Sequence, residues 1–120
     1  MREISAAEIT KTVDSLFREA NFYLTDDVLA AIKKAAKNEE STVGKEVLEQ
    51  IIQNAEIAAK ELIPLCQDCG AAVVFVELGQ EVHVTGGDLN TAINEGVKKA
   101  YDGGYLRKSM VKQPFSARIN

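Results

Sequence analysis

The sequence has 120 residues, enough for one domain with a modest core but too few for two well-packed ones. Hydrophobic residues make up 46% and charged residues 27%, as in ordinary globular proteins, and no apolar run is long enough to span a membrane. The formal net charge of −4 argues against nucleic-acid binding, which depends on clustered lysine and arginine. No secretory signal opens the chain, so we expect a cytoplasmic protein with neither a membrane nor a nucleic-acid partner.

A first helix is predicted over residues 6–20. Ser5 and Glu8 form a capping box, in which the serine hydroxyl accepts from an early backbone N–H and the glutamate reaches back to the N–H of Ser5. Ile4 and Ile9 have the spacing of a hydrophobic staple around this cap. Apolar residues then recur at helical intervals as far as Ala20, which predicts an amphipathic helix.

Two further helices are predicted before residue 64. Thr25 is placed to cap the second helix, which we expect to end at Asn38. Ser41 opens a third and longer helix. Pro64 closes it, because proline has no backbone N–H and disfavours the α conformation in the residue before it. We expect these three helices to pack together as an N-terminal bundle.

The pattern changes from helical to strand-like after Gly70. Residues 71–76 form a continuous β-prone apolar run, which is typical of a strand buried on both faces. Residues 77–81 contain a glycine and can turn the chain into a second strand over residues 82–84, which predicts a short β-hairpin. Asp88 is a suitable cap for a fourth helix that we expect to reach about Tyr101.

Residues 105–120 have no sustained apolar period, and we expect them to form a disordered tail. Their charged residues are all basic, namely Arg107, Lys108, Lys112 and Arg118, so the segment can attract anions, although a basic tail is often only a solvated one. The sequence stops without a terminating helix or strand, which we interpret as truncation. The predicted fold is therefore α+β, with an N-terminal domain over residues 1–104 and a basic tail over residues 105–120.

We expect any chemistry at the junction between the helical and strand-like parts, where both cysteines occur. Cys66 and Cys69 have a spacing that suits half of a zinc site, a dithiol redox pair, or one or two ligands of an iron–sulfur cluster. His83 is the one further zinc ligand candidate, and it is more simply interpreted as a strand histidine. A redox dithiol normally opens a helix, whereas Gly70 and a strand follow here. Simple packing of both cysteines at a helix-to-strand corner is the structural alternative.

Gln67 and Asp68 bring an amide and a carboxylate between the two cysteines. These side chains can supply a hydrogen-bond donor and a proton acceptor next to a metal. Aspartate is also among the commonest turn residues. The composition of this stretch therefore leaves both interpretations open.

Three stretches together carry a resemblance to a known family: Pro64-Leu65-Cys66-Gln67-Asp68-Cys69-Gly70, Thr85-Gly86-Gly87, and Tyr105-Leu106-Arg107-Lys108-Ser109. In this order they resemble the first part of the class I, iron–sulfur-dependent fumarate hydratases and their tartrate dehydratase relatives. The core motif of that family is Cys-Gln-Asp-Thr-Gly, in which the cysteine is one of three ligands to a 4Fe-4S cluster. The resemblance covers essentially the whole chain, but only about half or less of the family's α subunit.

The resemblance implies that Cys66 is a cluster ligand and that Gln67, Asp68 and Arg107 lie around a small dicarboxylate substrate. It also implies that a cluster iron without a thiolate ligand acts as a Lewis acid on the hydroxyl that departs as water. Asp68 is then expected to position the substrate or to move a proton, and Gln67 to hydrogen-bond a carboxylate. Arg107 is expected to grip that carboxylate bidentately.

Two departures from the family pattern limit what the chain is expected to do by itself. Cys69 stands where the family usually has threonine, so its role as an inert, redox-active or adventitious metal-binding residue is open. The other two cluster cysteines of the family are expected beyond Asn120. We therefore expect no cluster bound to this chain alone and no activity from it. The implied partners are the remainder of the α subunit and a β subunit.

Two further hypotheses stand beside the hydration of fumarate to malate. The acidic helical part and the unfinished tail are compatible with an autonomous docking module that binds the rest of the enzyme or another protein. A small metal or redox protein that uses Cys66 and Cys69 is the third hypothesis. It requires metal in the purified chain or a reversible disulfide.

Overall fold

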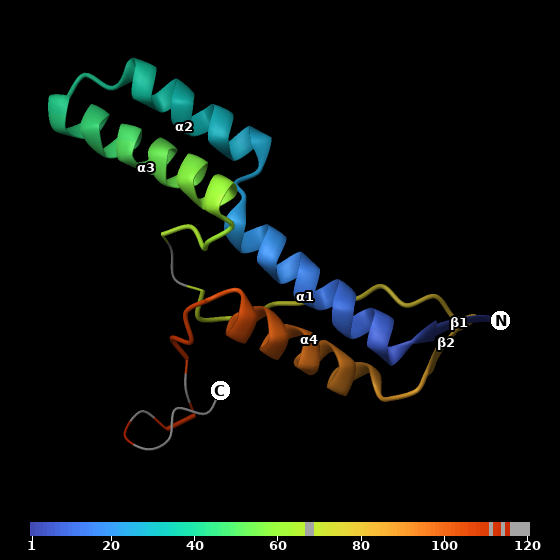
Figure 1. The fold of residues 1–120 in the computed structure, drawn as a ribbon. Coiled ribbons are helices and arrows are strands. Elements are labelled where there is room, and N and C mark those ends of the chain that lie inside the picture. The colour runs from blue at the N-terminus through green and yellow to red at the C-terminus, as the bar shows by residue number, and fades with distance from the viewer. Residues whose placement is uncertain (67–68, 111, 114, 116–120) are drawn as a thin grey trace. The chain divides into compact units, whose positions relative to one another are not determined.

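The computed structural model describes residues 1–66, 69–110, 112, 113 and 115, and it is mostly helical with two short parallel strands (Figure 1). Along the chain lie β1 (Arg2–Ser5), α1 (Ala6–Phe22), α2 (Asp26–Asn38), α3 (Thr42–Glu61), β2 (Val82–Thr85) and α4 (Leu89–Gly103). The chain divides into two compact units. Unit 1 comprises Met1–Arg18 and Asp68–Asn120, and unit 2 comprises Glu19–Gln67.

Unit 1 consists of two β-strand-to-helix segments that run in the same direction. β1 pairs with β2 in parallel, from Arg2 opposite Val82 to Ser5 opposite Thr85. The helices that follow, α1 and α4, lie side by side (Figure 1). The two helices contact each other near both of their ends. Near their N-termini the Thr10 hydroxyl donates to the Ala92 carbonyl over 2.9 Å, and towards their C-termini the centres of the Phe17 and Tyr101 rings lie 6.3 Å apart.

Small residues of α4 allow this close approach to α1. Ala92, Gly96 and Ala100 recur every fourth position and are all buried. A Cβ at Gly96 would lie only 2.7 Å from the Thr10 carbonyl oxygen and from the Val13 Cβ. The absence of a side chain at position 96 therefore sets how closely the two helices pack.

The predicted β-hairpin is wrong. Residues 71–79 form no strand, and their large apolar side chains are exposed instead of buried on both faces, as Phe75 shows with 93% of its surface accessible. β2 does form where the second hairpin strand was predicted, but its partner is β1, four residues that carried no strand prediction. A β-prone sequence forms a strand only when an adjoining strand edge and a surface to cover are available, and neither can be read from residues 71–76 themselves.

Unit 2 is built around two helices, α2 and α3, which lie side by side and run in opposite directions (Figure 1). Its core consists of Ala55, Ala58 and Leu65, against which Leu24 and Leu29 pack. The predicted bundle of three N-terminal helices is wrong, because the apolar face of α1 packs against α4 in unit 1. Helical periodicity identifies an apolar face but does not say which helix will cover it.

Three of the four helices in the described part of the chain have the N-terminal side-chain cap that the sequence predicts, and α2 is the exception. The side chains of Ser5, Ser41 and Asp88 accept from backbone N–H groups three residues further on. Thr25 occupies the N-cap position of α2, but its side chain makes no capping hydrogen bond, so its predicted role is wrong. None of the helices that the structure describes is long and apolar enough to cross a membrane.

The predicted tail lies only partly within the described residues. Residues 106–110 contain no helix or strand. Residues 111, 114 and 116–120, which include Arg118, are outside the described residues, so the predicted disorder of the tail stays a prediction.

Candidate functional site

The stretch from Pro64 to Cys66 is held to unit 2 by backbone contacts on both sides of Leu65. α3 ends as Leu62 adopts a left-handed conformation with φ 54°, and the Ile63 N–H turns back to the Ala58 carbonyl over 3.2 Å. Pro64 follows and prevents further helix. The Leu65 N–H then donates to the Asn21 carbonyl over 2.8 Å, while its side chain is buried. The backbone that leads to Cys66 is therefore held in place within unit 2.

Cys66 combines an anchored backbone with an exposed thiol. Its N–H donates to the side-chain oxygen of Asn54, on α3, over 3.0 Å. Its side chain is exposed. A thiol in this arrangement is accessible to a ligand, while the backbone that carries it is held in place. Among the residues that the structure describes, no group of three or more histidine, cysteine, aspartate or glutamate side chains is placed to hold a metal ion.

Gln67 and Asp68 lie outside the described residues, so their predicted roles are not tested by the structure. Cys69 resumes the described chain in unit 1 and differs from Cys66 in being buried, with 7% of its surface accessible. The hydroxyl of Tyr101 donates a hydrogen bond to the Cys69 carbonyl oxygen. Cys66 and Cys69 thus have different surroundings, one exposed in unit 2 and the other enclosed in unit 1.

Arg107 follows a tight turn at the end of α4. Tyr105 has a φ of 57°, and the Leu106 N–H donates back to the Tyr101 carbonyl over 3.2 Å. Leu106 is buried, whereas the side chain of Arg107 is exposed and forms no ion pair with another described residue. The turn therefore presents the guanidinium to solvent from an anchored backbone.

The neighbouring Lys108 is engaged locally. Its ammonium group forms an ion pair with the Asp102 carboxylate in the last turn of α4. The hydrogen bond from Lys108 holds the pKa of the Asp102 carboxyl below its ordinary value. Arg107 and Lys108 are adjacent basic residues in the sequence, but only Lys108 forms an ion pair with a described residue.

His83 lies on β2 opposite Glu3 of β1, with an exposed side chain. This placement agrees with its interpretation as a strand histidine. The structure also reveals two polar contacts that sequence reasoning missed, from Asn54 to Cys66 and from Tyr101 to Cys69. The partners lie 12 and 32 residues apart in the sequence, so no local pattern identifies either contact.

Comparison with known proteins assigns the chain to a family. The family model described as fumarate hydratase (fumerase) matches residues 10–120. The chain belongs to the fumarate hydratase family. The match includes the stretch around Cys66 and the turn that carries Arg107, so the resemblance noted from these motifs is confirmed.

Individual relatives in the fumarate hydratase family include both fumarate hydratases and tartrate dehydratases. A Methanocaldococcus jannaschii protein, provisionally named L(+)-tartrate dehydratase subunit alpha, is 40% identical over 87% of this chain and 37% of its own length. The anaerobic class I fumarate hydratase of Escherichia coli is 34% identical over 89% of this chain and 20% of its own length. The L(+)-tartrate dehydratase subunit alpha of Escherichia coli is 26% identical over 88% and 34%. The chain thus spans between a fifth and two-fifths of these relatives.

Proposed function

We propose that this chain forms part of an iron–sulfur hydro-lyase that interconverts fumarate and malate by reversible addition of water. Membership of the fumarate hydratase family and the relatives named as class I fumarate hydratases support this reaction class. The structural observation that carries the proposal is Cys66, an exposed thiol on a backbone held by Asn54 within the matched region.

Cys66 is proposed as one ligand of a 4Fe-4S cluster. An accessible thiolate is a donor of the right chemistry for iron in such a cluster. No group of three or more candidate ligands is placed together among the described residues, so the proposed cluster needs ligands in addition to Cys66. When bound, the cluster would supply a Lewis-acidic iron toward the substrate hydroxyl.

The remaining proposed roles belong to residues of this chain around the substrate. Arg107, exposed on its anchored turn, binds a carboxylate of the dicarboxylate substrate through two parallel hydrogen bonds. Gln67 donates a hydrogen bond to a substrate carboxylate, and Asp68 positions the substrate or moves a proton. The roles of Gln67 and Asp68 rest on the family resemblance.

The complete enzyme is proposed to need the remainder of an α subunit together with a β subunit. Relatives that are named subunit alpha of tartrate dehydratases support a multi-subunit enzyme. The chain alone is then expected to bind no complete cluster and to show no hydratase activity.

The test is anaerobic reconstitution of the corresponding full-length α and β proteins with iron and sulfide. We expect hydration of fumarate to malate, with L(+)-tartrate assayed in parallel because of the relatives' names. Cys66→Ser should abolish the visible absorbance of the cluster, and Cys69→Ser is the matched control that should retain it. Absence of dehydratase activity on malate and on tartrate in a correctly assembled protein would refute the proposal.

A docking function is the second candidate, and exposed apolar side chains favour it. Val73, Phe75 and Val76 lie in the irregular segment before β2 with 67%, 93% and 53% of their surfaces accessible. Single exposed apolar residues are normal on a protein surface, whereas large contiguous apolar patches mark interaction sites, and these side chains are close enough in sequence to contribute to one patch. Titration of the isotope-labelled chain with the remaining enzyme parts tests this candidate. Amide chemical shifts that stay unchanged throughout would exclude it.

A further inference from the structure

The C-terminal turn of α4 contacts both site-bearing segments of unit 1. On one side the Tyr101 hydroxyl donates to the carbonyl of Cys69, which ends the Cys66-to-Cys69 motif. On the other side the Tyr101 carbonyl accepts from the Leu106 N–H, next to Arg107. Tyr101 is therefore hydrogen-bonded to both Cys69 and Leu106, which lie far apart in the sequence.

Tyr101 is itself held firmly. Only 7% of its surface is accessible, and its ring packs against that of Phe17 on α1 with an angle of 53° between the ring planes. The preceding Ala100 is completely buried. Buried tyrosines normally find a hydrogen-bond partner for the hydroxyl, and here that partner is a backbone carbonyl in a segment without regular secondary structure.

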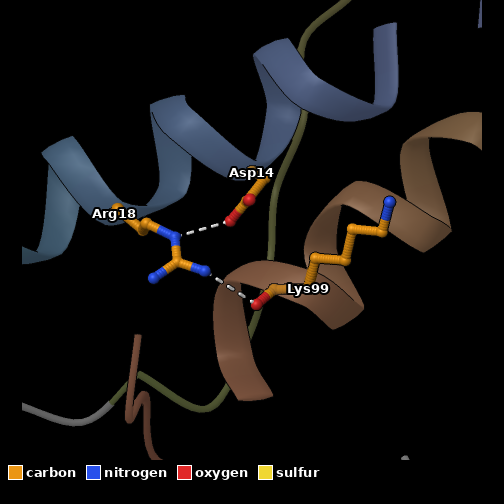
Figure 2. Close-up of polar contacts among 3 residues, drawn as sticks. All are labelled: Asp14, Arg18 and Lys99. Atoms are coloured by element: carbon orange, nitrogen blue, oxygen red, sulfur yellow. Dashed lines mark hydrogen bonds and ion pairs between the residues drawn. The ribbon is translucent and has the colours of Figure 1, made fainter. Parts of the chain in front are cut away.

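The guanidinium of Arg18 fixes the same turn from the side of α1. Figure 2 shows its Nε on the Asp14 carboxylate, at 2.7 Å, and its Nη2 on the Lys99 carbonyl oxygen, at 3.2 Å. Gly103 leaves room for this group, because a Cβ there would lie 2.5 Å from Nη2. An arginine that binds a carbonyl at the end of a helix also meets the negative end of the helix dipole. The turn carrying Tyr101 is thus clamped to α1.

We propose that Tyr101 is a positioning residue, whose hydroxyl holds the Cys69 backbone to the last turn of α4, the turn that also accepts from the backbone next to Arg107. The inference rests on the proposed function for its relevance to substrate, since Arg107 and the neighbours of Cys69 are the proposed site. The physical contact itself requires neither cluster nor substrate. Loss of the hydroxyl removes this hydrogen bond to Cys69, while the ring still fills its buried position.

The test uses the full chain and compares Tyr101→Phe with Tyr105→Phe, a matched control whose ring is 81% exposed. The rate of alkylation of each thiol is measured under native conditions by mass spectrometry. A buried thiol reacts through local opening, so loss of one hydrogen bond should accelerate alkylation of Cys69 about fivefold to tenfold. Cys66 serves as an internal control, because its thiol is already exposed. Its rate should not change in either variant.

A rescue variant separates positioning from general packing. Replacement of Tyr101 by p-aminophenylalanine retains a donor at the ring tip and should restore the slow alkylation of Cys69. An unchanged Cys69 rate in Tyr101→Phe overturns the inference, as does equal acceleration of both thiols. If Tyr101→Phe does not fold, the rescue variant decides: it must fold and protect Cys69, and its failure to do so also overturns the inference. Because no activity is measured, an inactive reconstituted enzyme would refute the proposed function without affecting this result.

Discussion

The contact between α1 and α4 predicts that Gly96→Ala destabilises unit 1, although alanine is the better helix former. Gly96 lies within α4 (Leu89–Gly103). A Cβ at this position would lie 2.7 Å from the Thr10 carbonyl oxygen, 2.7 Å from the Val13 Cβ and 2.8 Å from its Cγ1. The first two atoms belong to backbone or to the root of a side chain, so no rotamer change removes the overlap.

The magnitude follows from two opposing effects. Overpacking costs about 1–3 kcal/mol, and the rigid neighbours of Gly96 place this site near the upper value. Replacement of a helical glycine by alanine returns about 1 kcal/mol through helix propensity. The net loss in free energy of unfolding is therefore about 2 kcal/mol. With an unfolding entropy of about 2.1 cal/mol/K per residue, this loss corresponds to a fall in melting temperature of roughly 8 °C for a chain of 120 residues.

The matched control is Gly44→Ala in α3 (Thr42–Glu61) of unit 2. The three atoms nearest to its added Cβ all belong to the Glu39 side chain, whose Cγ and Cδ would lie 2.8 Å away and whose carboxylate accepts from the Ser41 N–H. This side chain can change rotamer at the cost of that one exposed hydrogen bond, so Gly44→Ala should destabilise the chain less than Gly96→Ala does. Thermal unfolding followed by circular dichroism gives the stability of each variant, and hydrogen exchange identifies the helices that are affected. A Gly96→Ala variant at least as stable as the unmodified chain would refute the packing argument.

Three other changes test the remaining parts of the fold. Leu65→Ala removes a core side chain of unit 2 and should lower the free energy of unfolding by about 2–5 kcal/mol, measured by urea titration. Ser41→Ala removes the cap of α3 and should cost about 1 kcal/mol in the same titration, whereas Ser41→Asp should retain the cap. Hydrogen bonds from the backbone and side chain of Thr91 lower the pKa of the Asp88 carboxyl below its ordinary value of 3.8. Its stabilisation of α4 is therefore present above about pH 4 and is lost as the pH falls through the lowered pKa, and Asp88→Asn should remove this pH dependence from acid unfolding curves.

The helices were predictable because their signals are local. Ser5, Ser41 and Asp88 each lie three residues before the N–H that they cap, so the start of a helix can be identified from a short stretch of sequence. Thr25 had the same local signal and formed no capping hydrogen bond, because a suitable residue type does not guarantee the side-chain conformation that a cap requires.

The sheet and the helix partners could not be predicted, because they depend on contacts between distant residues. Pairing of Arg2 with Val82 joins opposite parts of the sequence, and β1 has no alternating apolar pattern that would identify it as a strand. Residues 71–76 had a strong β pattern and form no strand. Strand propensity describes how well a residue fits a half-buried pleated surface, and the sequence did not show where such a surface would be.

The candidate site was predictable only at the level of residue type and family motif. Cys66 was identified from its motif, but its exposure and its contact with Asn54 required the structure. The contact between Tyr101 and Cys69 could not be predicted either, because in the sequence Tyr101 only marked the expected end of a helix. Long-range polar contacts of this kind have no local signature, because either partner alone resembles an ordinary helix or loop residue.

In the turn after α4, two adjacent basic residues differ in their surroundings. By sequence, Arg107 and Lys108 are adjacent cations that add equally to the positive charge of the tail. In the structure the Lys108 ammonium is paired with Asp102, and the hydrogen bond from Lys108 lowers the pKa of the Asp102 carboxyl. Arg107 makes no ion pair with any other described residue and has the planar, bidentate geometry that matches a carboxylate. If Arg107 binds a substrate carboxylate as proposed, Arg107→Lys should raise the KM for fumarate of the reconstituted α and β proteins, because the net charge is kept while the bidentate geometry is lost. An unchanged KM would contradict the role proposed for Arg107.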